Sequence, residues 1–343
     1  MPPTKKPLSH LTSKYLQHTS HLCGLPNTGT KKTLLTTLRA AAALPAALTP
    51  TSRILSIDLG IRNLAFALLV PRRTTTTLEA WKRLDLLPPA SASALAHDFS
   101  PPSTAHIALS LLRTHLLPLA PTHVLIERQR YRSGGAAAVL EWTLRVNALE
   151  TALHAALATM RHLDVWRGRV VSVPPRRATN FMVGVGGEGE GVRLLVADEG
   201  RGRSLMGAAL AGELTAARRK KAMKLAKVRL VEASLKEGKA VALGTDEARE
   251  AARRFLAAGE PKRRRKKGDP VVDKGEDDRK RDDLADCLCQ GVAWLQWQRN
   301  MEDLKVKEKE WLLAPGEEAQ VQDAEEFWNL GGQGLPGAED VLK

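Results

Sequence analysis

Two carboxylates stand at the ends of short apolar segments, where a charged group is costly to bury. Asp58 follows Ile-Leu-Ser-Ile, and Glu127 follows Val-Leu-Ile. We expect both segments to be strands, and ligands of open α/β sheets gather outside the carboxyl ends of such strands. If the two strands are parallel neighbours, the two carboxylates lie side by side and need a cation between them. The pair therefore predicts a divalent-metal site.

A third group of acids, Asp282, Asp283 and Asp286, has helical spacing. Residues three and four apart share a helix face, and the small Ala285 beside them would let that face approach a sheet closely. Carboxylate oxygens without His or Cys favour Mg²⁺ or Mn²⁺ over zinc. The alternative for Asp282 and Asp283 is a structural role, because the N-terminus of a helix stabilises acidic side chains.

The elements that must position these acids are read from apolar periodicity and breakers. The order is strand, strand, strand, helix, strand, helix, strand, with the first three strands in an antiparallel meander. Strands are expected at 52–57, 62–70, 75–84, 123–127 and 169–173. Helices are expected near 104–119, 137–161, 213–237 and 245–258, and a final helix from 282 or 283 to about 300. The Gly-rich stretch 184–191 is expected to be a loop within an insertion.

The first 57 residues contain no Asp or Glu but many Lys, Arg, Ser and Thr. This composition is typical of a mitochondrial transit peptide and also of a small DNA-binding element. Residues 11–25 and 30–44 each have helical spacing and are separated by Pro-Asn-Thr-Gly, which predicts a helical hairpin. Pro45 and Pro50 then interrupt any helix, so residues 41–50 are interpreted as a tether.

The charge of the chain is strongly positive but unevenly distributed. The 343 residues carry a net charge of +14, yet residues 301–343 are acidic, so residues 1–300 hold 48 basic and 27 acidic side chains. Such a body attracts a polyanion such as nucleic acid, although a merely solvated surface has the same composition. No run approaches the ~18 apolar residues of a membrane span, so no membrane partner is expected. Three cysteines exclude a disulfide framework and a four-cysteine zinc site.

Three segments carry a resemblance to a known family. They are IDLGIRNLAFALL, LIERQRYRSGGAAAVLEWTLRVNALE and RDDLADCLCQGVAWLQW. They resemble the signature segments of fungal mitochondrial cruciform-cutting endonucleases, a branch of the RuvC-like Holliday junction resolvases in the ribonuclease H-like superfamily. The resemblance implies an α/β fold with a mixed five-stranded sheet flanked by helices, over residues 52–300 with a charged insertion at about 181–280. The segment LCGLPNTGTKKTLLTTL resembles a SAP-like hairpin, here residues 1–45, and residues 301–343 form an acidic tail.

The resemblance also implies an activity and a site. Four metal-binding, catalytic carboxylates fall on Asp58, Glu127, Asp283 and Asp286, with Asp282 left over. Asp58 would bridge two ions, Mg²⁺ with Mn²⁺ as a substitute. The implied activity is paired hydrolysis of DNA phosphodiesters in a four-way junction, in mitochondrial DNA recombination and segregation, without a nucleotide cofactor.

Basic residues near the acids and in the hairpin are the candidates for DNA contacts. The set is Arg62, Asn63, Arg128, Arg130, Tyr131, Arg132, Lys31, Lys32, Lys221 and Lys224. The arginines after Glu127 suit phosphate clamping and the tyrosine suits base stacking, although a solvated loop has the same pattern. Residues 219–227 place basic side chains on one face of the expected helix 213–237, which is equally typical of a surface helix. The run Lys-Arg-Arg-Arg-Lys-Lys at 262–267 has the composition of a nuclear localisation signal or a DNA-contacting loop, but a disordered, solvated segment is the expectation.

Two other classes of protein compete with the nuclease interpretation. The segment IDLGIRN also resembles the first phosphate segment of actin-like ATPases, but no second phosphate loop follows. A noncatalytic packaging protein of mitochondrial DNA would use only the basic surface, and four acids in a nuclease pattern argue against it. We also expect a homodimer, because a four-way junction has approximate two-fold symmetry. The candidate interface residues are Leu140, Leu144 and Leu153, or Trp294 and Trp297, although ordinary core packing explains both sets equally well.

Overall fold

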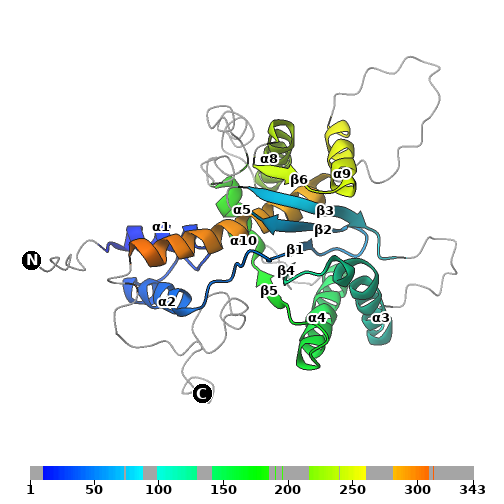
Figure 1. Cartoon of the computed structure of the whole chain (residues 1–343), viewed down its shortest axis with the longest axis horizontal. Helices are drawn as coiled ribbons and strands as arrows, with labels where there is room; N and C mark the ends of the chain where they lie inside the picture. The colour runs from blue at the N-terminus through cyan, green and yellow to red at the C-terminus, as the bar shows by residue number, and fades with distance from the viewer. Residues whose placement is uncertain are drawn as a thin grey trace, which may run out of the picture.

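A single mixed sheet forms the centre of the protein (Figure 1). The computed structural model describes residues 11–72, 75–87, 99–129, 141–184, 190, 195, 216–238, 240–259, 281–308 and 312. The strands are β1 (Ile54–Asp58), β2 (Leu64–Pro71), β3 (Thr76–Leu84), β4 (His123–Glu127), β5 (Arg169–Val173) and β6 (Val241–Leu243). Their order across the sheet is β5-β4-β1-β2-β3-β6.

The pairing of the strands confirms the predicted order of elements. The strands β1, β2 and β3 form an antiparallel meander, while β4 pairs parallel to β1 and β5 pairs parallel to β4. The α/β class is therefore confirmed, but the sheet has six strands rather than the expected five. The sixth, β6, pairs parallel to β3 from within the expected insertion. Its three residues are too few for an apolar pattern to be recognised.

Helices cover both faces of the sheet (Figure 1). The α-helices of the described residues are α1 (Ser13–Leu22), α2 (Lys31–Ala43), α3 (Pro101–Leu111), α4 (Glu141–His162), α5 (Pro175–Val183), α8 (Ala216–Glu237), α9 (Asp246–Ala257) and α10 (Arg281–Lys307). The short helix α5 was not predicted, and α10 extends beyond its expected end near Asn300. The segment 262–267 and most of 184–191 and 301–343 lie outside the described residues.

Alternate residues of β1 face different helices. Leu55 and Ile57 pack with α3 and α4 on one side, whereas Ile54 packs with α10 and α5 on the other. Because both faces are covered, every residue of the strand before Asp58 is buried, and all of them but Ser56 are apolar. Asp58 lies on the α10 side by the same two-residue alternation.

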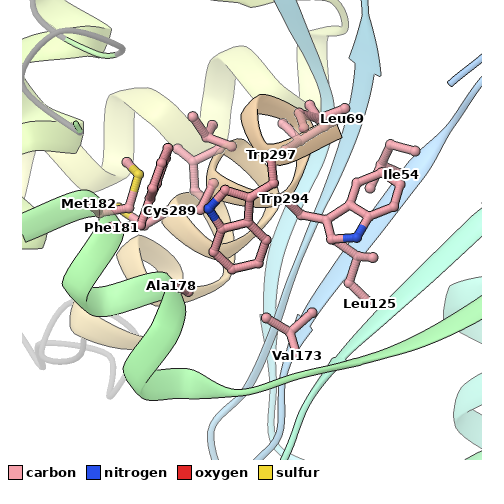
Figure 2. Close-up of a cluster of buried hydrophobic side chains, with 14 of the residues drawn as sticks. Ile54, Leu69, Leu125, Val173, Ala178, Phe181, Met182, Cys289, Trp294 and Trp297 are labelled. Carbon is pink, nitrogen blue, oxygen red and sulfur yellow. The ribbon is translucent and has the colours of Figure 1, made fainter. Parts of the chain in front are cut away.

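The final helix, α10, packs closely against β1. Gln290 donates hydrogen bonds from its Nε2 to Ser56 Oγ at 3.1 Å and to the Ile57 carbonyl at 3.2 Å. A Cβ added at Gly291 would lie 3.1 Å from Ser56 Cβ, so this glycine allows the close approach. Figure 2 shows Trp294 directed toward the sheet and Trp297 directed toward Phe181 of α5. This packing fixes the N-terminal turn of α10 near the end of β1.

The other end of α10 holds the N-terminal hairpin of α1 and α2 (Figure 1). Asn300 Nδ2 donates to the Leu22 carbonyl at 2.6 Å, and Lys305 Nζ donates to the Leu44 carbonyl at 2.7 Å. The side chains of Thr12 and Thr30 cap the two short helices. The apolar residues of the hairpin belong to the same core as α10 and the sheet. The hairpin is therefore packed against the sheet domain rather than held only by a tether.

None of the helices within the described ranges is long and apolar enough to cross a membrane.

Gly24, in the turn between α1 and α2, provides a test of this packing. Its φ is +69°, and an added Cβ would lie 2.1 Å from the buried ring of Trp297. We expect Gly24→Ala to lower the free energy of unfolding by about 1–3 kcal/mol through overpacking, on top of the cost of its backbone conformation. Urea denaturation, monitored by circular dichroism, measures this loss of stability.

Gly238 is the matched control, because its φ is +64° and nothing lies within 4 Å of an added Cβ. Gly238→Ala carries the backbone cost without the contact. Equal losses of stability in the two variants would show that the hairpin does not pack on Trp297.

Candidate active site

Asp58 and Glu127 lie side by side at the carboxyl ends of β1 and β4. The two strands are parallel, and Ile57 is in register with Ile126, so the next residue of each strand is an acid. Both acids lie on the face of the sheet that α10 covers. The predicted juxtaposition of the two strands is therefore confirmed.

The helix α10 adds Asp283 and Asp286 to the same region. Burial raises the pKa of Asp58 well above its usual value, and the charge of Glu127, a hydrogen bond with it, and the charges of Asp286 and Asp283 raise it further. These interactions place the four carboxylates within electrostatic reach of one another. Like charges this close make the ionised form of each costly and favour a bound cation.

Arg83 of β3 is a site residue that sequence analysis missed. Asp58 is in register with Ala65 of β2, and Ala65 is in register with Arg83, so the three lie in one row across the sheet. The small alanine leaves room for Arg83 Nε to lie 3.6 Å from Asp283 Oδ2. Arg83 Nη2 also donates to Asn63 Oδ1 at 2.6 Å. Counting the register of the predicted meander could have indicated this row.

Lysines of α8 face the acids of α10. Lys227 Nζ lies 2.5 Å from Asp286 Oδ1, and both side chains are largely buried. Burial, the largest single influence, lowers the pKa of Lys227, but the charge of Asp286, the hydrogen bond with it and the charges of Cys289 and Glu127 together raise that pKa above its usual value. Lys224 donates to Asp282 Oδ2 at 2.6 Å in a more exposed pair. The basic face expected on this helix is thus partly directed at the acidic site.

Asp282 and Asp283 differ in their electrostatic surroundings. Burial, followed by the charge of Asp282, raises the pKa of Asp283 to about 6. Burial, the largest single influence, acts in the same direction on Asp282, but the hydrogen bond with Lys224 and the charge of Lys224, together with smaller contributions, lower the pKa overall. Asp282 is therefore satisfied by a protein cation, whereas Asp283 Oδ2 is buried and accepts no hydrogen bond.

The donor set of this region fits a hard divalent cation. It consists of carboxylates, and the buried Asp283 Oδ2 atom is without a hydrogen-bond donor. Among the described residues, however, no three His, Cys, Asp or Glu side chains are already gathered as a metal cage. Arg83 and Lys227 instead face Asp283 and Asp286. The acids are in place, and these two protein cations offset part of the charge of Asp283 and Asp286.

The candidate DNA-contact residues lie in several different environments. Lys31, Lys32 and Lys221 are exposed. The side chain of Arg62 is 57% exposed, and its Nη1 atom lies 3.9 Å from Asp85 Oδ2. Asn63 accepts the hydrogen bond of Arg83, and Lys224 pairs with Asp282, so both have protein partners. Arg130, Tyr131 and Arg132 lie outside the described residues.

The chain that leaves β4 is held by neighbouring elements. Arg128 Nε donates to Ser172 Oγ at 3.0 Å, and the backbone N–H of Gln129 donates to Glu150 Oε2 at 3.0 Å. Ser172 belongs to β5 and Glu150 to α4. These contacts fix the direction of the backbone immediately after Glu127, and neither partner was indicated by the sequence.

The fold and the site together define an α/β protein of the ribonuclease H-like class, with acids at the ends of two parallel strands and on the last helix. A family model described as "Mitochondrial resolvase Ydc2 / RNA splicing MRS1" matches residues 54–304. The chain belongs to this family. The resemblance seen in the sequence is therefore confirmed.

Two relatives support the same assignment. The chain is 36% identical over 143 residues to the mitochondrial cruciform cutting endonuclease 1 of Schizosaccharomyces pombe, a match that covers 41% of this chain and 53% of that protein. It thus spans about half the length of this curated relative. The crystal structure of the yeast mitochondrial Holliday junction resolvase Ydc2 superposes with a TM-score of 0.56 at 25% identity, covering 87% of this chain and 98% of that one. Neither relative is named as an actin-like ATPase.

The raised pKa of Asp58 predicts how the metal-free protein responds to pH. The folded state holds the proton of Asp58 to a higher pH than the unfolded chain does. Ionised Asp58 therefore lowers the free energy of unfolding above about pH 4, where the unfolded chain loses that proton. In chelator at pH 7, the free energy of unfolding of the Asp58→Asn variant should exceed that of wild type by on the order of 1 kcal/mol.

The gain should shrink toward zero as the pH falls to about 4, which urea titrations at several pH values would measure. Asp303→Asn, at an exposed position of α10, is the control and should change little. A loss of stability in Asp58→Asn at pH 7 would contradict the electrostatic description of the site.

Proposed function

We propose that the protein is a structure-selective endonuclease that resolves four-way DNA junctions by metal-dependent hydrolysis of phosphodiesters. The observation that carries the proposal is the convergence of Asp58, Glu127, Asp283 and Asp286 from β1, β4 and α10. Both relatives are named as enzymes of this kind, one a cruciform cutting endonuclease and the other a Holliday junction resolvase. The similarity to these relatives supports four-way junction DNA as the substrate. The group of four carboxylates supports metal-dependent hydrolysis as the chemistry.

The four carboxylates would hold Mg²⁺, or Mn²⁺ in its place, with two ions per site. Asp58 is central, between Glu127 on the neighbouring strand and the acids of α10. Divalent cations bound there would lower the pKa of an attacking water and stabilise the departing oxygen. The protein fixes the ligands through the β1–β4 pairing and the hydrogen bonds of Gln290 to β1.

Basic residues around this site would bind the phosphate backbone. Arg62 and Arg128 follow the two strand acids, and the SAP-like hairpin presents Lys31 and Lys32 at the exposed start of α2. Such contacts give affinity without sequence specificity and weaken as salt rises. The hairpin is fixed to the same helix that carries Asp283 and Asp286, so the two DNA-contact regions would keep a constant spacing.

The family description also names RNA splicing, which is the second candidate function. A protein that only binds RNA has no use for four acids that repel one another and oppose folding. We therefore place the nuclease first. Parallel assays on a four-way DNA junction, linear duplex DNA and structured RNA, each with Mg²⁺ and with chelator, separate the two functions.

A mitochondrial location is proposed from the relatives and from the start of the chain. Both relatives are named as mitochondrial. Residues 1–57 are basic and free of acids, as in a transit peptide. The location would bring the enzyme to mitochondrial DNA, where it would act in recombination and segregation.

A homodimer is proposed because two opposed strands of a junction must be cut. Of the residues considered for the interface, Leu153, Trp294 and Trp297 are buried in the core, so they serve packing within one chain. Leu140 lies outside the described residues. Leu144 of α4 is 48% exposed and remains the candidate.

Removal of one carboxylate should separate catalysis from binding. We expect Asp58→Asn and Glu127→Gln to reduce junction cleavage in Mg²⁺ by about 100-fold or more, because the metal ligands are lost. Affinity for the junction should remain within about threefold, since phosphate contacts come from Arg and Lys. Gel assays measure the cleavage rate and the affinity for the junction. Asp303→Asn is the control and should leave both quantities unchanged. Cleavage at the wild-type rate by either variant would remove the metal hypothesis.

The dimer is tested at Leu144. We expect Leu144→Lys to shift the protein from dimer to monomer in analytical ultracentrifugation, because a charge would be buried in the interface. Leu163→Lys, at a 64% exposed position just after α4, should leave the dimer intact. A monomeric wild-type protein on the junction would contradict the proposal of a dimer.

A further inference from the structure

Lys227 is a buried lysine whose ammonium group lies among the acids of the site. The residue is 8% exposed, and its Nζ atom lies 2.5 Å from Asp286 Oδ1. It also interacts electrostatically with Glu127. A buried ammonium group needs such partners because it has lost its hydration. Helix α8 thus places a positive charge inside the acidic cluster.

The carboxylate that Lys227 contacts is one of those proposed to hold the metal. An ammonium group and a divalent cation on the same carboxylate repel each other, and the repulsion is strong where water is excluded. The described part of the chain shows no three-ligand metal cage, and Asp286 faces a protein cation in this arrangement. Lys227 therefore offsets part of the negative charge of the site from within the protein.

Lys224, one turn earlier on α8, provides a contrast. Its side chain is 42% exposed, and it pairs with Asp282, which is not among the proposed metal ligands. Both lysines carry the same charge on the same helix. Only Lys227 contacts a carboxylate that the metal would need.

We propose that Lys227 is the built-in counter-cation of the metal-free site and competes with the metal ion for Asp286. While no metal is bound, its ammonium group holds Asp286 close to Glu127 and reduces the repulsion among the acids. Binding of the metal requires the ammonium group to leave Asp286. Lys227 is in this sense a positioning residue that stabilises the metal-free protein and weakens its affinity for Mg²⁺. The inference rests on the proposed function, because it takes these acids as the metal ligands.

Calorimetric titration of the DNA-free protein with Mg²⁺ tests the competition. We expect Lys227→Met, which keeps most of the side-chain volume, to bind Mg²⁺ about tenfold more tightly or better than wild type. Lys224→Met should bind within about twofold of wild type, because its charge is more exposed and screened. Unchanged or weaker binding by Lys227→Met would overturn the inference.

A double-mutant cycle in chelator tests the same contact without metal. Asp286→Asn should lower the melting temperature in the wild-type background, because Lys227 loses its partner while remaining buried. In the Lys227→Met background the same substitution should not lower it. Circular dichroism at low temperature establishes that each variant is folded. Equal losses in the two backgrounds would contradict the inference.

Junction cleavage by wild type and Asp58→Asn, assayed in parallel, separates this inference from the proposed function. If cleavage requires Mg²⁺ and Asp58→Asn is inactive while Lys227→Met binds Mg²⁺ as wild type does, only the role of Lys227 is wrong. If wild type binds no Mg²⁺ and Asp58→Asn still cleaves, the proposed function fails and the inference fails with it.

Discussion

Mutual repulsion among four carboxylates is the interaction around which the rest of the structure is arranged. Asp58 and Glu127 are forced together by the parallel pairing of β1 and β4, and α10 adds two more acids. Unscreened, such a cluster would push α10 away from the sheet. The helix stays because Gln290 bonds to β1, Gly291 allows close packing, and Trp294 and Trp297 bury a large apolar surface. Packing along most of one helix thus holds the charges of its first turns in place.

The same helix joins the two parts of the protein that would meet DNA. With 27 residues, α10 extends roughly 40 Å at 1.5 Å per residue. Its first turns carry Asp283 and Asp286, and its last turns bind the hairpin through Asn300 and Lys305. Because the hairpin shares a hydrophobic core with the sheet, its position relative to the acids is set by packing. A rigid spacing suits a substrate whose arms leave a fixed branch point.

Two protein cations face the acids of the site and offset part of their negative charge. Arg83 faces Asp283 from β3, and Lys227 faces Asp286 from α8. Both are almost buried, so their charges are weakly screened and act strongly on the carboxylates. They allow a folded protein to hold four acids together in the absence of metal. The helix α8 belongs to the charged insertion, which therefore contributes to the site as well as to the surface.

The sequence by itself determined the acids and the core elements that carry them. Side-chain direction repeats with a fixed period within each strand or helix. The sequence alone therefore shows that an acid ends an apolar strand, and that two acids three residues apart share one face of a helix. Periodicity says nothing about which residue of another element lies opposite. The contact of Lys227 with Asp286 was therefore decided only by the tertiary structure, which packs α8 against α10. The contact of Arg83 with Asp283 likewise depends on that structure, although strand register across Ala65 could have indicated the row of Arg83. The packing of Gly24 on Trp297 and the addition of β6 to the sheet were likewise decided there, because contacts between distant segments depend on the whole fold.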